Sequence, residues 1–374
     1  MHSELIAFSA RLRDLIHAHR FFRAGEVLDV QFDSLALELF ALQFQNNPVY
    51  GKICTARGQT PETVRHWSDI PAVPTAAFKE LDLTSIPAGE RTAVFHSSGT
   101  TGQKNSRHFH HAASLALYET SLLKWYEPHF GFAGSLLALT PPPAQVPHSS
   151  LVHMFDCIRR QYPPGLVQFC GHVGAESAWE LDLPRLLPAL TAASQSNQPV
   201  TLLGTAFSFV HLLDALAAQG LRFQLPTGSR VMETGGYKNR SRTLPKAELH
   251  ALIADRLGLP LPAIACEYGM SELSSQAYDS ALSCANSSTA AASQRQFQFS
   301  PWSRVQIISP ETGQEVAEGE TGLIRIFDLA NVFSVAAIQT EDLGIRRGDG
   351  FELLGRAVAA EPRGCSLNVG ELKP

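Results

Sequence analysis

Apolar residues recur at helical spacing near the start of the chain. They lie three or four positions apart over residues 5–16, and a second run with the same period covers residues 32–40. Charged residues such as Glu4 and Arg11 interrupt the first run, whereas a signal peptide needs an unbroken apolar stretch. The pattern therefore predicts two amphipathic helices that pack on the body of the protein, and no signal peptide.

After these helices, short apolar runs typical of buried strands alternate with helical segments. Strands are predicted at residues 93–98, 135–141, 166–171, 199–205 and 229–236, and helices at 207–219 and 245–257. Strands and helices in repeated alternation predict an α/β protein with a mostly parallel sheet flanked by helices. In an open sheet of this kind, ligands bind at the carboxyl ends of the strands.

The pattern changes towards the end of the chain. Residues 281–298 are poor in large apolar side chains, and we interpret them as a flexible loop. Strands predicted at 303–309, 322–329 and 351–356, separated by polar turns, indicate a small antiparallel β subdomain. The expected organisation is an N-terminal helical segment at 1–45, an α/β core at 46–300, the β subdomain at 301–356 and a tail at 357–374.

Composition excludes several classes of partner. The 374 residues include 30 Lys+Arg and 35 Asp+Glu, so there is no positive surplus for nucleic acid or an anionic membrane. The six cysteines form no CxxC pair, which argues against a zinc ribbon or a disulfide framework and favours the cytoplasm. His211 and Asp214 interrupt the most apolar later stretch, which is shorter than the roughly 20 residues that span a bilayer. We therefore expect no nucleic-acid binding and no membrane span.

A polar, glycine-containing segment follows the strand predicted at 93–98. It reads Ser97-Ser98-Gly99-Thr100-Thr101-Gly102-Gln103-Lys104. Glycines let backbone N–H groups approach an anion closely, and the hydroxyls and the lysine add donors and charge for polyphosphate oxygens. The spacing differs from that of the GxxxxGK[ST] loop. An ordinary polar turn stays open as an alternative, because Ser, Thr and Gly are common turn residues.

Four motifs in this order resemble those of the adenylate-forming superfamily, which includes acyl-CoA synthetases, firefly-type luciferases and peptide-synthetase adenylation domains. The first is the polar loop. Tyr268-Gly269-Met270-Ser271-Glu272 looks like the YGxTE-type motif, and Thr340-Glu341-Asp342-Leu343-Gly344 is similar to the TGDLG motif. Gly355-Arg356 matches the GR that follows it.

The resemblance implies roles for these residues. Lys104 and the loop residues Ser97 to Gly102 would bind the phosphates of ATP. Tyr268 would lie beside the adenine, with Gly269 and Ser271 in the same nucleotide site, and Glu272 would hold Mg²⁺. Asp342 would hydrogen-bond the ribose hydroxyls near Arg356. A structural role for Glu272 or Asp342, as a helix cap or an arginine partner, stays open.

Within that superfamily, residues 46–367 resemble the LuxE-like acyl-protein synthetases of the bacterial bioluminescence fatty-acid reductase system. The stretches that carry the likeness include NNPVYGKIC, HSSGTTGQKNS, SSLVHMFD, ETGGYKNRSR and RGCSL. The resemblance implies the fold of the adenylate-forming N-terminal domain. It also implies that ATP converts a fatty acid into an acyl-adenylate, whose acyl group passes to a cysteine thiol and on to an acyl-accepting or acyl-reducing protein.

The chain departs from the superfamily after Arg356. Most members continue into a mobile C-terminal domain that carries a catalytic lysine, whereas residues 357–374 resemble only the hinge and the first strand of that domain. Lys238 is our candidate for a replacement, because it follows a Gly-Gly turn after a predicted strand, at the ligand end of the sheet. A solvated surface lysine is the alternative.

Cys365, in Arg363-Gly364-Cys365-Ser366-Leu367, is the candidate acyl acceptor. Its position in a terminal tail would let the thiol reach the adenylate and then a partner, although a role as a small apolar residue in a terminal strand stays open.

Three further features are assigned no chemistry. We expect the apolar residues of 207–216 to line or back the acid pocket, His108, His110 and His111 to cluster at the surface or a pocket rim, and Cys157, Cys170 and Cys266 to fill core space.

The leading hypothesis is therefore an ATP- and Mg²⁺-dependent acid:thiol ligase that forms AMP and acylates a protein cysteine. One alternative is an acyl- or aryl-CoA ligase that uses coenzyme A or a carrier-protein thiol. Another is a non-catalytic scaffold that binds an acyl-protein partner. The presence of Thr100, Lys104, Glu272 and Asp342 together argues against the scaffold, because a decayed site should have lost some of them.

Overall fold

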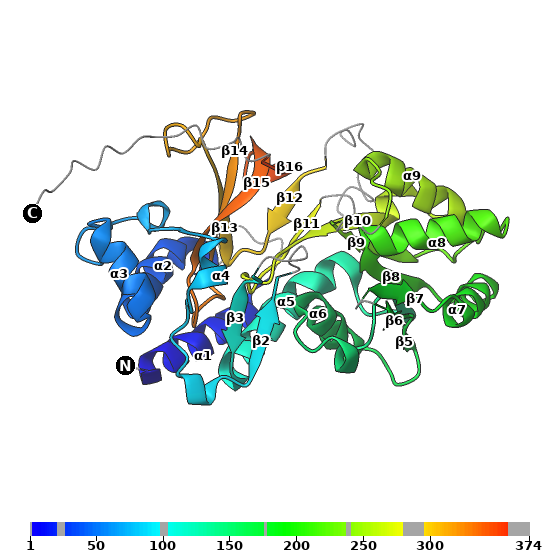
Figure 1. The fold of residues 1–374 in the computed structure, drawn as a ribbon, viewed down its shortest axis with the longest axis horizontal. Coiled ribbons are helices and arrows are strands. Elements are labelled where there is room, and N and C mark those ends of the chain that lie inside the picture. The colour runs from blue at the N-terminus through cyan, green and yellow to red at the C-terminus, as the bar shows by residue number, and fades with distance from the viewer. Residues whose placement is uncertain are drawn as a thin grey trace, which may run out of the picture.

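A computed structural model describes most of the chain, and Figure 1 shows its helices and strands. The described residues are 2–20, 27–97, 104–175, 178–236, 241–279 and 295–357. Among the described helices, none combines the length and the apolar character needed to cross a bilayer.

Five parallel strands form one half of the large sheet, in the order β5-β4-β8-β9-β10. They are β4 (Ser135–Ala138), β5 (Val167–Phe169), β8 (Val200–Thr205), β9 (Arg230–Thr234) and β10 (Ile264–Tyr268). All residues of β8 are buried, as expected for a strand covered on both faces. The strand order reverses between β4 and β8, which favours a ligand site at the carboxyl ends of these strands.

Helices cover both faces of the parallel half. One face carries α5 (Ala112–Phe130) and α6 (Ser150–Arg159), and the other carries α7 (Leu183–Gln195), α8 (Ala206–Ala218) and α9 (Lys246–Leu257). Because side chains alternate along a strand, Val231 packs in the core towards α8 and α9, whereas Met232 packs in the core towards α5 and α6. Thr205 ends β8 and caps α8, since its side chain accepts a hydrogen bond from the Ser208 amide.

The other half of the sheet is antiparallel. From β10 the hydrogen-bonded order continues through β11 (Ala277–Asp279), β12 (Phe297–Phe299), β16 (Gly350–Arg356), β15 (Ala337–Arg347), β14 (Thr321–Asp328) and β13 (Ser303–Ile308). The short β1 (Val73–Pro74) pairs with β15. In the described part of the chain, the parallel and antiparallel strands therefore form one sheet of 12 strands.

The N-terminal helices lie against the antiparallel half (Figure 1). They are α1 (His2–Ala18), α2 (Val27–Asn46) and α3 (Pro48–Ala56). Leu5, Phe8 and Leu12 of α1 are buried in the same apolar cluster as Trp302. Two hairpins and one short helix complete the described elements that matter below: β2 (Ala93–His96) with β3 (Arg107–His110), β6 (Gly171–Val173) with β7 (Trp179–Leu181), and α4 (Ala77–Glu80).

The predicted strands and helices are confirmed to within a few residues, with two exceptions. Strand β15 was not predicted, because its many polar residues do not form the apolar run of a strand. The loop interpretation of 281–298 is wrong at its end, because Phe297 begins β12, and residues 281–294 lie outside the described part. In β12 only Phe297 and Phe299 are buried. Two apolar residues are too few for the alternation of a strand to be recognised in the sequence.

We expect Leu12→Ala to lower the free energy of unfolding by about 2–5 kcal/mol, because Leu12 is fully buried and its truncation leaves a cavity. Ile6→Ala on the same helix is the matched control, since Ile6 is 42% exposed, and its cost should be about 0.5 kcal/mol. Urea unfolding of both variants measures the difference. Equal losses would contradict the packing of α1 described above.

Candidate active site

The β2–β3 hairpin presents the two ends of the predicted phosphate loop. The Ser97 hydroxyl oxygen accepts a hydrogen bond from the Ser106 amide at 3.0 Å, which holds the ends together. Residues Ser98 to Gln103 lie outside the described part of the chain. At the far end, Lys104 Nζ lies 2.9 Å from Glu80 Oε2 on α4, and both side chains are more than half exposed. A phosphate that binds Lys104 would therefore replace Glu80 as its partner.

The second, third and fourth motifs meet at one point of the sheet. Tyr268 ends β10, and its hydroxyl donates a hydrogen bond to Asp342 Oδ2 at 2.9 Å. Arg356 pairs with Asp342 across β15 and β16, with its Nε 3.7 Å from Asp342 Oδ1 and its side chain 81% exposed. Burial raises the pKa of Asp342, and Tyr268 and Arg356 act against that shift. The rings of Phe297, Phe299 and Phe351 surround Tyr268.

The turn after Tyr268 is fastened to the strand that follows the phosphate loop. His108 Nδ1 donates to the Ser271 carbonyl at 2.8 Å, and the hydroxyl oxygens of Ser106 and Ser271 lie 3.4 Å apart. Burial lowers the pKa of His108 to about 4, so the imidazole is neutral. The expectation of a surface or rim cluster is wrong, because His108, His110 and His111 are all buried, with 3%, 1% and 8% exposure.

Glu272 lies on the same turn and is buried. Its Oε2 accepts a hydrogen bond from the Ser271 hydroxyl at 3.0 Å, and its carbonyl accepts one from Asn331 Nδ2 at 2.8 Å. Carboxylate oxygens are the ligands that Mg²⁺ prefers, together with phosphates and water. The donor chemistry of Glu272 therefore fits the predicted metal ligand.

A cavity of about 60 Å³ opens at the carboxyl ends of β9 and β10. The strands contribute Thr234 and Glu267, which are register neighbours. The other lining residues come from α5, α6 and the turn after β10: Tyr118, Ser150, Leu151, Met154, Gly269, Met270 and Gln276. None of the described residues of 207–216 lines this cavity, because α8 packs on the opposite face of the sheet. Their expected place lining or behind the acid pocket stays a prediction.

Glu267 is the functional candidate that sequence analysis missed. Burial raises the pKa of its carboxyl group to about 7; the Thr234 hydroxyl opposes the shift and Glu233 adds to it. A Cβ atom at Gly269 would lie 2.3 Å from Glu267 Oε1, so the glycine makes room for this carboxyl group. The available signal was an acidic residue at the end of the apolar run Ile264–Tyr268.

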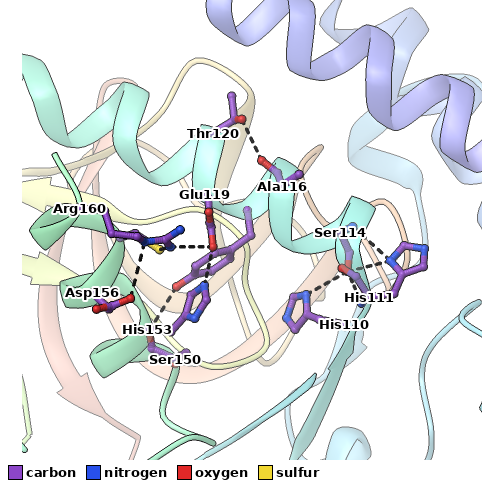
Figure 2. A network of polar contacts seen from close by, with 12 residues as sticks. His110, His111, Ser114, Ala116, Glu119, Thr120, Ser150, His153, Asp156 and Arg160 are labelled. Atoms are coloured by element: carbon purple, nitrogen blue, oxygen red, sulfur yellow. Dashed lines mark hydrogen bonds and ion pairs between the residues drawn. The ribbon is translucent and has the colours of Figure 1, made fainter. Parts of the chain in front are cut away.

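A polar network ties α5 to α6 beside the cavity (Figure 2). Glu119 Oε1 lies 3.1 Å from His153 Nε2 and 2.9 Å from Arg160 Nη2. The hydrogen bond with His153 is the main cause that lowers the pKa of Glu119 to about 2. Glu119, His153 and Cys157 could hold a metal ion by their spacing, but the Arg160 guanidinium already contacts Glu119 and Cys157. We therefore interpret the cluster as a support for the cavity wall.

Two predicted catalytic residues, Lys238 and Cys365, lie outside the described part of the chain. The cysteines expected in the core are buried: Cys157, Cys170 and Cys266.

Comparison with known proteins identifies the family. Residues 171–372, more than half of the chain, match the family model described as acyl-protein synthetase, LuxE. The chain belongs to the LuxE acyl-protein synthetase family. The resemblance inferred from the motifs is thus confirmed, as is the prediction of a ligase.

Two relatives of this LuxE family member are named long-chain-fatty-acid–luciferin-component ligase. The protein of Aliivibrio fischeri is 23% identical, with 91% of this chain and 88% of the relative covered. That of Vibrio harveyi is 22% identical, with 89% and 85% covered.

Solved structures show the fold. A 2-hydroxyisobutyryl-CoA ligase in an open conformation, in complex with 2-HIB-AMP and CoA, matches with a TM-score of 0.67 at 13% identity, over 90% of this chain and 76% of that one. The same enzyme in the thioesterification state gives a TM-score of 0.65 at 14% identity, over 90% and 69%. The predicted adenylate-forming fold is therefore confirmed.

We expect Glu267→Gln to stabilise the protein increasingly as the pH rises from 5 to 8. The native pKa of Glu267, about 7, lies above the unfolded value near 4.5, so the native state binds the proton more tightly and the free energy of unfolding falls as the pH rises between these values. Between these pH values the free energy of unfolding of the wild type should fall by about 3 kcal/mol through this group. The amide variant should not show this fall.

Thermal unfolding at several pH values measures this effect. Glu248→Gln makes the same change at an exposed acid of α9 and is the matched control. A difference between Glu267→Gln and wild type that does not change with pH would contradict the raised pKa.

Proposed function

We propose that this chain uses ATP to convert a fatty acid into an acyl-adenylate and then transfers the acyl group to a protein cysteine. The observation that carries the proposal is the junction of Tyr268, Asp342 and Arg356, which lies at the end of β10 together with the Glu272 turn and the cavity. The family match and the names of the two relatives support the same reaction.

In this proposal the nucleotide binds across the junction. Tyr268 contacts the adenine, Asp342 accepts hydrogen bonds from the ribose hydroxyls, and Arg356, which is exposed beside Asp342, contacts the nucleotide from outside. The loop from Ser97 to Gly102 binds the phosphates, with Gly269 and Ser271 in the same site. The link between Ser106, His108 and Ser271 supports this assignment, because it joins the strand that follows the phosphate loop to the Glu272 turn.

The first step joins a carboxylate oxygen of the acid to the α-phosphorus of ATP and releases pyrophosphate. Lys104 neutralises phosphate charge as the carboxylate attacks, and Mg²⁺ held by Glu272 supplies further charge neutralisation when bound. We assign Lys238 to the acid carboxylate, since Thr234 of the same segment lines the cavity. Holding the acid and the nucleotide together removes the entropic cost of bringing them into line.

In the second step a thiolate attacks the acyl carbon and AMP leaves. We assign the thiol to Cys365, from which a second protein accepts or reduces the acyl group. The described cysteines are buried and free, which fits a reducing compartment, and we place the protein in the cytoplasm. Coenzyme A as the acceptor is the second candidate, favoured by the fold shared with a CoA ligase.

We expect Lys104→Ala and Glu272→Ala each to lower acid-dependent exchange of pyrophosphate into ATP by about 10²-fold or more, because each removes charge stabilisation from the transition state. Lys52→Ala, an exposed lysine on α3, is the control and should exchange at the wild-type rate. If either variant folds and still exchanges pyrophosphate at a near-native rate, the substituted residue does not act in adenylation. Binding of ATP by the wild type without any exchange would instead favour the scaffold.

Cys365→Ser should keep the exchange reaction but lose the hydroxylamine-labile acyl label on the protein, because only the second step needs the thiol. Incubation with radiolabelled acid and ATP, followed by gel analysis with and without hydroxylamine, tests this. If the variant still becomes acylated, Cys365 is not the acceptor. Direct formation of acyl-CoA by the wild type without a labelled protein would favour the ligase alternative.

A further inference from the structure

One lining residue of the cavity has a hydrogen-bond acceptor without a partner among the described residues. Gln276 is 5% exposed and lines the cavity, and its Oε1 makes no hydrogen bond within the described residues. A buried acceptor left unpaired is costly, so its environment favours a ligand that donates a hydrogen bond. Gln276 is thus the first sign that the acid carries a polar group.

Glu267 lies at the same cavity and can act as a donor. Its neighbours are the hydroxyl of Thr234 on β9 and two phenols, Tyr278 on β11 and Tyr118 on α5. The other charged group that acts on it, Glu233, is also acidic, and burial raises the pKa of Glu267 to about 7. A substantial fraction of the carboxyl group is therefore protonated at neutral pH and offers an O–H donor.

A hydroxyl group satisfies both residues, because it donates one hydrogen bond and accepts others. It can donate to Gln276 Oε1 and accept from the protonated Glu267. An ammonium group only donates, and would fit the ionised form of Glu267 instead.

The size of the cavity limits where such a group can lie along the acid. A cavity of about 150 Å³ holds a benzene molecule, so the 60 Å³ here hold only a few non-hydrogen atoms. Gly269 and Met270 of the nucleotide motif also line it, which puts the cavity next to the carboxylate to be activated. The polar group therefore belongs close to the carboxylate, and an alkyl chain must extend outside the cavity.

We propose that the acid activated by this chain carries a hydroxyl group on carbon 2 or carbon 3, which binds between Gln276 and Glu267. This inference rests on the proposed function and specifies its substrate. It makes Gln276 and Glu267 specificity-determining residues, and it predicts that an unsubstituted acid leaves the Gln276 acceptor unpaired.

The test is acid-dependent pyrophosphate exchange by the full wild-type chain with matched acids. Octanoic and tetradecanoic acid are each compared with their 2-hydroxy, 3-hydroxy and 2-amino derivatives. We expect kcat/KM for one of the hydroxy acids to exceed that for the unsubstituted acid of the same length by at least about tenfold. Equal or better use of the unsubstituted acids would overturn the inference, as would a preference for the 2-amino acids. Exchange with none of the acids would overturn the proposed function as well.

A variant pair then assigns the preference to the cavity. Gln276→Met removes the acceptor at similar size and should reduce the hydroxy-to-unsubstituted ratio to within about twofold of unity. Gln298→Met makes the same change at an exposed position of β12 and should keep the wild-type ratio. An unchanged ratio in a folded Gln276→Met variant would overturn the assignment. If that variant does not fold, the wild-type comparison of acids still decides the proposal.

Discussion

The arrangement of the site depends on one buried carboxylate, that of Asp328. It has no exposed surface, and it accepts hydrogen bonds from the Ser274 amide at 2.9 Å, the Ser275 hydroxyl at 2.8 Å and the Ala330 amide at 2.9 Å. Burial raises the pKa of Asp328, whereas these donors favour its charged form. An ion in this position is tolerable only because several donors surround it, so the turn that carries Glu272 is held to the end of β14.

Further hydrogen bonds connect the segment around Asp328 and Glu272 to other parts of the candidate site. Asn331 bonds to the Glu272 carbonyl, and Gln43 of α2 bonds to the carbonyl of Asn331, so the N-terminal helices brace the same segment from behind. On the opposite side, His108 connects the turn to the β2–β3 hairpin. The N-terminal helices thus support the site although they carry none of its motifs.

The sequence predicted the parts of the structure that repeat with a local period. Apolar runs such as the one in β8 mark strands because both faces of the sheet are covered. The proximity of Tyr268 and Asp342 followed only from resemblance, since the two residues belong to strands joined through β11, β12 and β16. The burial of His108 and the position of Glu267 could not be predicted, because both depend on which distant segments cover them. Alternation places a side chain on a face, but it does not say what packs there.

The continuous sheet limits how far the junction of Tyr268, Asp342 and Arg356 can open when a ligand binds. The strands that carry Tyr268, Asp342 and Arg356 belong to one hydrogen-bonded sheet, which runs from β10 through β11, β12 and β16 to β15 and has one register pair between β12 and β16. Opening the junction between them would require hydrogen bonds of this sheet to break, whereas a hinge between separate domains opens at little cost. If adenosine binds at this junction as proposed, its site is already ordered before the ligand arrives, and little of the binding free energy is lost in ordering it. We therefore expect any large motion during the reaction to involve segments outside the strands from β10 to β15.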